Sequence, residues 1–184
     1  MPALSTARAR ARGVPTGVER RLGTDDLIVT KTDLRGHLTY CNDTFVRVTA
    51  ADEHDVMGRA HNLIRHPDMP GGVFRLMWDR LTAGEEIFAY VVNLALDGQH
   101  YWVLAHVTPT YDSAATVIGY HSTRRSPSRS AIAPVTDLYA RMRTVEQGLA
   151  RHAAAEASLA WLQEHLASLD LTYEEWLWSL EVEL

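Results

Sequence analysis

Three consecutive strand-like stretches constrain the fold of this chain more than any other feature. Residues 87–96 (IFAYVVNLAL), 99–111 and 115–124 are rich in β-branched and aromatic residues. Asp97 and Gly98 separate the first two stretches, and this dipeptide favours a two-residue hairpin because both positions of a type I′ turn need positive φ. The pattern predicts an antiparallel sheet in this part of the chain.

An earlier pair of strands and a group of helices complete a compact domain. Residues 27–33 and 37–42 are strand-like runs on either side of turn-forming residues, a pattern typical of a second hairpin. Asp43 and Asp52 stand where N-caps of two short helices are expected, and apolar spacing over 73–84 predicts a longer helix. Two strands, helices and then three strands indicate an α+β fold with an antiparallel sheet.

The two ends of the chain differ from this domain in composition. The first 21 residues carry five Arg against one Glu and few large apolar residues, which is typical of a solvated tail. Beyond residue 134 apolar residues recur at spacings of three and four, which predicts amphipathic helices, the third beginning after Asp170 or Thr172. The expected organisation is a basic flexible tail at 1–24, an α+β domain at 25–125, a linker at 126–134 and a helical segment at 135–184.

Composition excludes several classes of function. The net charge of −5 lies mostly on the body of the protein, which argues against a nucleic-acid-binding face. No apolar run approaches the roughly 20 residues of a membrane span, and there is no secretory signal, so we expect a cytoplasmic protein. The single cysteine, Cys41, excludes a disulfide framework and a Cys-rich metal site. No G-x-S-x-G, Walker or G-x-G-x-x-G motif is present, so we expect no enzymatic activity.

The densest polar cluster lies in an irregular stretch between the two groups of strands. It consists of His61, Asn62, Arg65, His66 and Asp68. Histidine and aspartate are common metal ligands, but the His61–His66 spacing of five is not that of a helical zinc motif. The cluster can also bind an anion through Arg65 and His66, or form a surface loop held by its own hydrogen bonds. These readings stay open on composition alone.

Four segments in the predicted α+β domain resemble the PAS domain of aerotaxis (Aer-type) receptors. They are residues 32–49 (TDLRGHLTYCNDTFVRVT), 58–70 (GRAHNLIRHPDMP), 74–84 (FRLMWDRLTAG) and 97–109 (DGQHYWVLAHVTP). The resemblance covers about residues 25–125 in the right order. It implies the PAS fold, in which a five-stranded antiparallel sheet carries helices on one face.

The resemblance also implies a ligand and a site. Members of this family bind FAD non-covalently and report redox or oxygen status. Matched by motif, the cofactor-binding residues are Asn42, Arg65, His66, Asp68, Trp78 and Asn93. The asparagines can exchange hydrogen bonds with the pyrimidine edge of an isoalloxazine, Trp78 can wall the pocket, and Arg65 with His66 can offset a diphosphate. The chain departs from the family at Ile87, where a Trp is usual, with Phe88 or Tyr90 as the available aromatic replacement.

Two other readings of the same domain remain as alternatives. Some PAS domains of this broad type bind haem through a histidine, for which His61 and His66 are the candidates, and others bind no ligand and serve as dimerisation or interaction modules. Cys41 precedes Asn42 rather than following it, so flavin-adduct photochemistry is not indicated. We expect the C-terminal helices either to cap the domain or to form a homodimer or dock a signalling partner, since no output enzyme fits in about 50 residues.

Overall fold

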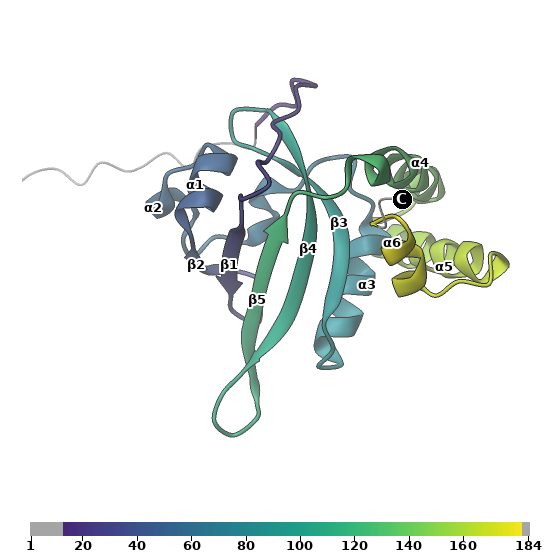
Figure 1. Ribbon diagram of the computed structural model, residues 1–184. Helices are drawn as coiled ribbons and strands as arrows, with labels where there is room; N and C mark the ends of the chain where they lie inside the picture. The colour runs from purple at the N-terminus through teal and green to yellow at the C-terminus, as the bar shows by residue number, and fades with distance from the viewer. Residues whose placement is uncertain (1–12, 182–184) are drawn as a thin grey trace, which may run out of the picture.

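A computed structural model describes residues 13–181 and confirms the expected α+β fold (Figure 1). Five strands form one antiparallel sheet in the order β2-β1-β5-β4-β3. The strands are β1 (Ile28–Thr32), β2 (Leu38–Cys41), β3 (Ile87–Leu94), β4 (His100–Tyr111) and β5 (Val117–Arg125). Each lies within three residues of the bounds expected from sequence, because alternating apolar residues and the Asp97-Gly98 turn specify strand pairing locally.

The helices between β2 and β3 cover one face of the sheet, which we call the inner face. They are α1 (Asp43–Thr49), α2 (Glu53–Val56), the 3₁₀-helix η1 (His61–Ile64) and α3 (Gly71–Thr82). The polar cluster noted in the sequence therefore begins in η1. Asn42, not the expected Asp43, is the N-cap of α1, and its Oδ1 accepts a hydrogen bond of 3.1 Å from the Phe45 amide. Asn42 has the extended backbone that an N-cap requires.

The expected linker at 126–134 is mostly helical, which corrects the sequence prediction. Helix α4 (Arg129–Glu146) begins at Arg129 and contains Pro134 in its second turn. There the proline removes only one helical hydrogen bond, the one that would reach the Ser130 carbonyl. Helices α5 (Arg151–Ser168) and α6 (Tyr173–Ser179) follow, and Thr172 caps α6 in a reciprocal capping box with Glu175.

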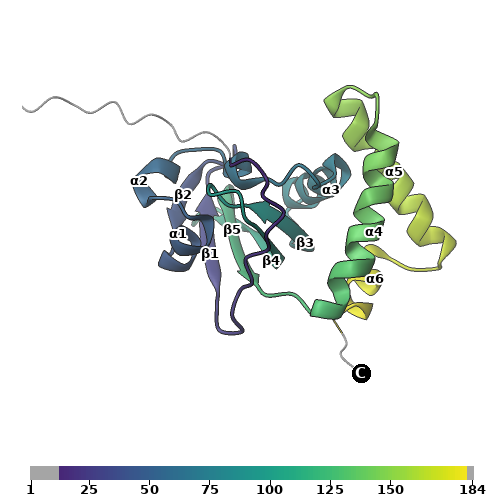
Figure 2. The same cartoon turned by 90° about the horizontal axis from the view of Figure 1, so that it is seen from above.

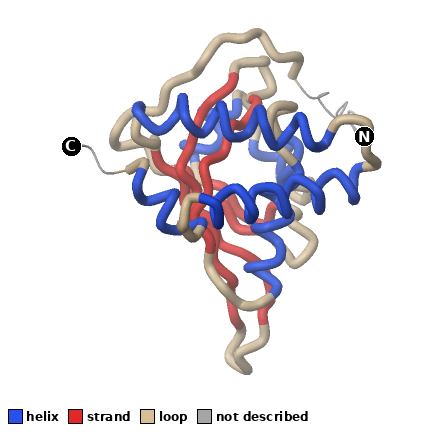
Figure 3. The backbone as a smooth tube through the Cα atoms, turned by 90° about the vertical axis from the view of Figure 1, so that its right-hand side faces the viewer, coloured by secondary structure: helices blue, strands red, loops and turns tan. Residues whose placement is uncertain are grey.

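The C-terminal helices pack on the β3 edge of the sheet and on α3 (Figures 2 and 3). The Tyr139 hydroxyl of α4 donates a 2.6 Å hydrogen bond to the Tyr90 carbonyl of β3. On the outer face, Phe88 meets Trp178 of α6 with ring centroids 4.8 Å apart, and Tyr90 lies near Trp176. Phe88 and Tyr90 thus face α6 and do not replace an aromatic wall on the inner face. Their direction follows from strand alternation, because Val91 and Asn93 point inward.

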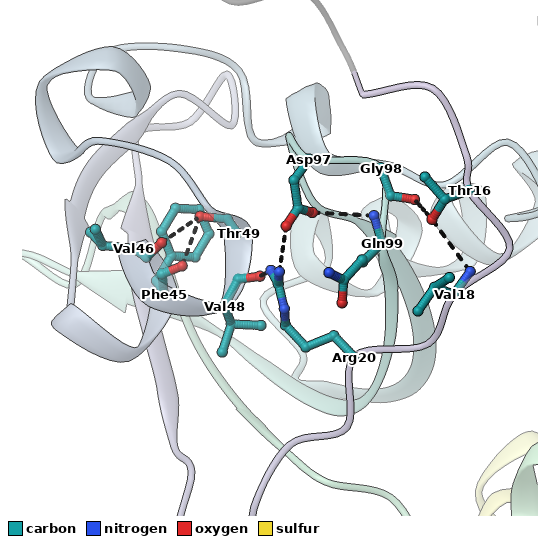
Figure 4. A network of polar contacts seen from close by, with 10 residues as sticks. All are labelled: Thr16, Val18, Arg20, Phe45, Val46, Val48, Thr49, Asp97, Gly98 and Gln99. Carbon is teal, nitrogen blue, oxygen red and sulfur yellow. Dashed lines mark hydrogen bonds and ion pairs between the residues drawn. The ribbon is translucent and has the colours of Figure 1, made fainter.

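Residues 13–24 are the described part of the expected flexible tail, and they depart from expectation because they pack against the domain (Figure 4). The Thr16 amide and hydroxyl both donate to the Gly98 carbonyl at 2.9 Å, and Arg20 pairs with Asp97 and donates to the Val48 carbonyl. Glu19 forms an ion pair with Arg129 at the start of α4. The remaining part of the expected tail, residues 1–12, lies outside the described residues, as do 182–184.

In the described part of the chain, no helix combines the length and the apolar character that crossing a bilayer requires.

Candidate ligand-binding site

A cavity of about 900 Å³ lies between the inner face of the sheet and the helices η1, α3 and α5. This volume is near the upper end of the roughly 300–1,000 Å³ typical of small-molecule sites. Strands β1, β3, β4 and β5 form its floor, and exposed residues at its border mark the entrance. These exposed residues are Arg35, Asn62, Pro67, Trp78, Arg151 and His152.

The floor of the cavity presents polar atoms that lack protein partners. Asn93 and Ser122 are 4% and 5% exposed, and neither the Asn93 Nδ2 nor the Ser122 Oγ has a hydrogen-bond partner. Both side chains line the cavity beside apolar neighbours, Val91 on β3 and Val107 on β4. A buried donor without a partner costs about 1–3 kcal/mol, so such groups mark a place where a polar ligand can bind.

Arg124 is a buried cation at the floor of the same cavity. Its side chain lies on β5 and donates to the Thr30 Oγ1 at 3.0 Å and to the His61 Nε2 at 2.9 Å. Among the described residues, no carboxylate forms an ion pair with it. Burial lowers the pKa of the Arg124 guanidinium to about 10. A charge removed from water without a counter-ion is costly, so the floor favours an anionic or strongly electron-rich ligand group.

Hydrogen bonds set the tautomers of His61 and His66, two of the histidines that line the cavity. Arginine can only donate, so the His61 Nε2 accepts from Arg124 and carries no proton. The His66 Nδ1 accepts a 3.1 Å hydrogen bond from the Asp68 amide, which places the proton on Nε2. Burial lowers the pKa of His66, and burial with the charge of Arg124 holds the pKa of His61 well below its ordinary value.

These lowered pKa values predict a loss of stability in mild acid. The unfolded histidines take up protons near pH 6.5, whereas the folded rings resist protonation, so stability is fully present above that pH and decreases below it. Replacing His61 by Gln keeps an acceptor for Arg124 and removes one titrating ring. We expect the free energy of unfolding of His61→Gln to fall less between pH 7.5 and 5.5 than that of the wild type.

Urea unfolding at the two pH values measures this difference. The control is His54→Gln, because His54 is exposed on α2 and lies away from the cavity. Equal pH dependence of His61→Gln and wild type would show that His61 takes up its proton as readily in the folded protein as in the unfolded chain, which contradicts the prediction.

Aromatic side chains and Arg65 form the side of the cavity near its entrance. The Arg65 guanidinium lies 4.4 Å from the ring centroid of Phe74, and its Nη2 donates to the Met69 carbonyl at 2.8 Å. Trp78 meets Tyr120 edge-on at 5.4 Å and is 39% exposed. The entrance can therefore hold a planar ring system against apolar surface.

Of the residues matched by motif, the structure brings four to the cavity and leaves two outside its lining. Arg65, His66, Trp78 and Asn93 line it. The Asn42 amide is committed to the backbone, since its Oδ1 also accepts from Val29 at 3.0 Å and its Nδ2 donates to the Leu27 carbonyl at 2.8 Å.

Asp68 is the second residue outside the lining. Its side chain is 62% exposed and faces α4, where Arg143 donates a 2.7 Å hydrogen bond to the Asp68 carbonyl. Ile87, at the departure from the family pattern, is 3% exposed in the core and does not line the cavity either.

Sequence reasoning missed Ser122 and Arg124 on β5. Their signal was the period-two alternation Tyr120, Ser122, Arg124, which places all three on one face of the strand. Arg124 is the last residue of the predicted strand and lies close to the expected linker at 126–134, where an arginine is ordinarily solvated. Only the tertiary structure shows that this face is buried.

Comparison with known proteins agrees with this fold. Residues 38–124 match the family model described as "PAS fold". The aerotaxis receptor of Escherichia coli (strain K12) is 34% identical over 152 residues, which are 83% of this chain and 30% of the receptor. The chain thus spans less than a third of that relative's length.

Two solved structures share the fold at low sequence identity. One is a light-oxygen-voltage domain studied with a flavin analogue, at 16% identity and a TM-score of 0.53, covering 62% of this chain and 86% of that one. The other is the blue-light activated histidine kinase EL346 of Erythrobacter litoralis, also at 16% identity and a TM-score of 0.53, covering 66% of this chain and 41% of that one.

Proposed function

The chain contains a PAS domain of the aerotaxis-receptor type, and on this premise we propose that its cavity binds FAD non-covalently and that the protein is a cytoplasmic sensor of redox or oxygen status. One observation carries the proposal. Two buried polar atoms without partners, the Asn93 Nδ2 and the Ser122 Oγ, share a cavity floor with Arg124, a buried cation that has no carboxylate partner among the described residues.

The donors at the floor match the needs of an isoalloxazine. Its pyrimidine edge carries carbonyl acceptors, which Asn93 and Ser122 can satisfy, and its apolar ring fits beside Trp78 and Phe74. When bound, a flavin would supply electron-accepting chemistry, and its reduction would change the charge and hydrogen-bonding pattern of the ring. The positive charge of Arg124 favours added negative charge at the floor of the cavity.

The two alternative readings are less well supported by the same atoms. Haem needs a histidine nitrogen with a free lone pair, but in both candidate histidines that lone pair already accepts a hydrogen bond, from Arg124 at the His61 Nε2 and from the Asp68 amide at the His66 Nδ1. A PAS module without a ligand has no use for a large cavity with orphaned donors, which lower its stability. We therefore favour the flavin.

The C-terminal helices supply the route for a signal. Helices α4 and α5 pack against the domain, and the Arg143–Asp68 and Glu146–Gly71 contacts join them to the segment that lines the cavity. A change of ligand state would shift the preferred position of these helices. We propose that they report it to a protein partner or a second copy of the chain.

The visible absorption spectrum of the purified protein tests the cofactor. We expect the paired near-ultraviolet and blue bands of an oxidised flavin, released as FAD on denaturation. The apoprotein should recover these bands when FAD is added. A strong Soret band, or a colourless protein that takes up no flavin, would contradict the proposal.

Removal of the Asn93 amide should separate binding from stability. Asn93→Leu deletes a buried donor that has no partner in the protein, so the apoprotein should be at least as stable as the wild type. FAD affinity should fall about five- to tenfold, since one hydrogen bond contributes roughly 1 kcal/mol. Flavin fluorescence titration and urea unfolding measure the two quantities. Unchanged affinity would remove Asn93 from the site.

A further inference from the structure

The cavity is completed by a helix that lies outside the PAS domain. Arg151, His152 and Ala155 in the first turns of α5 belong to its lining, together with Glu146 at the end of α4. None of these residues falls within the segment 38–124 that matches the PAS fold. The entrance of the cavity is therefore shared between the domain and its C-terminal helices.

Close contacts hold α5 in this place. A Cβ on Gly72 would lie 2.5 Å from the Ser158 Oγ and 2.7 Å from the Leu159 amide nitrogen, so α3 and α5 approach at backbone distance. The Glu146 carboxylate accepts from the Gly71 amide at 2.6 Å and from the Ser158 hydroxyl at 2.6 Å. These contacts of α5 with α3 and with Glu146 of α4 therefore hold it in a fixed position at the wall of the cavity.

The charged side chains that line the cavity are mostly positive. The cavity lining contains five arginines and one carboxylate, although the whole chain has a net charge of −5. That carboxylate, Glu146, already accepts hydrogen bonds at the start of α3, and Arg75 is neutralised by Asp79 and Glu156. Within the described residues, Arg35 and Arg151 form no ion pair. Two cations therefore remain available to an anion at the entrance.

We propose that Arg151 of α5 binds a phosphate of the flavin side chain, so that the C-terminal helices select phosphorylated flavins and sense occupancy directly. This inference rests on the proposed function and adds that a residue outside the PAS domain determines ligand choice. With the pyrimidine edge at Asn93, the phosphate-bearing chain would extend toward the entrance, where Arg151 would hold its phosphate. The guanidinium is exposed before binding, so its contribution decreases with salt.

The test compares three ligands on the wild type and three variants of the full chain. Dissociation constants for FAD, FMN and riboflavin are measured on the apoprotein by flavin fluorescence. Arg151→Ala should weaken FAD and FMN roughly fivefold or more and leave riboflavin unchanged, because riboflavin has no phosphate. Arg151→Lys should retain most of the preference. The matched control is Arg141→Ala, which removes the same charge from an exposed site on α4 away from the cavity.

Two outcomes have separate meanings. If Arg151→Ala weakens all three flavins equally or none of them, the role of Arg151 is overturned while the proposed function stands. If the wild type binds no flavin, the proposed function fails, and this inference with it.

Hydrogen exchange gives a second readout. Coupling is reciprocal, so FAD should slow amide exchange in the first turns of α5 more than riboflavin does. Arg151→Ala should abolish that difference. Equal protection by both ligands in the wild type would contradict the proposal.

Discussion

Arg124→Met is expected to weaken FAD binding about ten- to a hundredfold while leaving the apoprotein as stable as the wild type or more stable. A charge-assisted hydrogen bond contributes roughly 1.5–3 kcal/mol to binding, and about 1.4 kcal/mol corresponds to a factor of ten. In the apoprotein the guanidinium is buried without a carboxylate partner among the described residues, so an apolar side chain of similar length relieves a desolvation cost. Flavin titration and urea unfolding of the apoprotein measure the two effects.

The neighbouring arginine is the control for this experiment. Arg125 carries the same charge but is exposed and pairs with Glu181 at 2.8 Å on the outer side of the protein. Arg125→Met should leave FAD affinity unchanged. If Arg124→Met destabilises the apoprotein by several kcal/mol and binds FAD normally, Arg124 is a structural residue that holds Thr30 and His61 in place.

Gly72→Ala is expected to lower the melting temperature by about 4–8 °C. In an ordinary helix this change would be stabilising, because alanine has a propensity about 1 kcal/mol better than glycine. Here the new Cβ would meet the Ser158 Oγ and the Leu159 backbone, and the backbone atom cannot rotate away. Overpacking costs typically 1–3 kcal/mol or more, which outweighs the gain and displaces α5.

Calorimetry of Gly72→Ala beside Gly23→Ala separates the contact from the general effect of adding a methyl group. A Cβ on Gly23 would lie 3.5 Å from the Asp26 Oδ2, an ordinary contact, and its φ is not positive. We expect Gly23→Ala to change stability by less than about 0.5 kcal/mol. A melting temperature of Gly72→Ala equal to or above that of the wild type would show that α5 is not held rigidly against α3.

Local patterns in the sequence predicted the sheet well and the boundaries of its appendages less well. The Asp97-Gly98 turn and the alternation around it specify β3 and β4 because neighbouring residues decide a hairpin. The start of α4 was not predicted, because the Ser and Pro residues at 126–134 have weak helix propensity. Packing on the sheet overrides that propensity in the folded protein. Residues 13–22 look like a solvated tail, yet Arg20 finds Asp97 and the Val48 carbonyl, partners far away in the chain.

The candidate site shows the same division. The motifs selected Arg65, His66, Trp78 and Asn93, and these four residues line the cavity. Long motifs from several segments of one domain can select residues that are distant in the chain but close in the fold. Matching by motif also selected Asn42 and Asp68, whose side chains the structure places outside the lining. An asparagine before a helix can be an N-cap as readily as a ligand contact, and the amino-acid sequence alone does not distinguish these two roles.

By itself the sequence determined the α+β class, the two hairpins and the resemblance to an aerotaxis-type PAS domain, because these depend on local alternation, turns and long motifs; the pairing of β1 with β5 needed the tertiary structure. Only the tertiary structure decided that Arg124 is buried, that the Asn93 and Ser122 polar atoms lack partners, and that α5 lines the entrance. The physical reason is distance along the chain. Thr30, His61, Arg124 and Arg151 share one cavity only after strand pairing and helix packing have joined segments separated by dozens of residues.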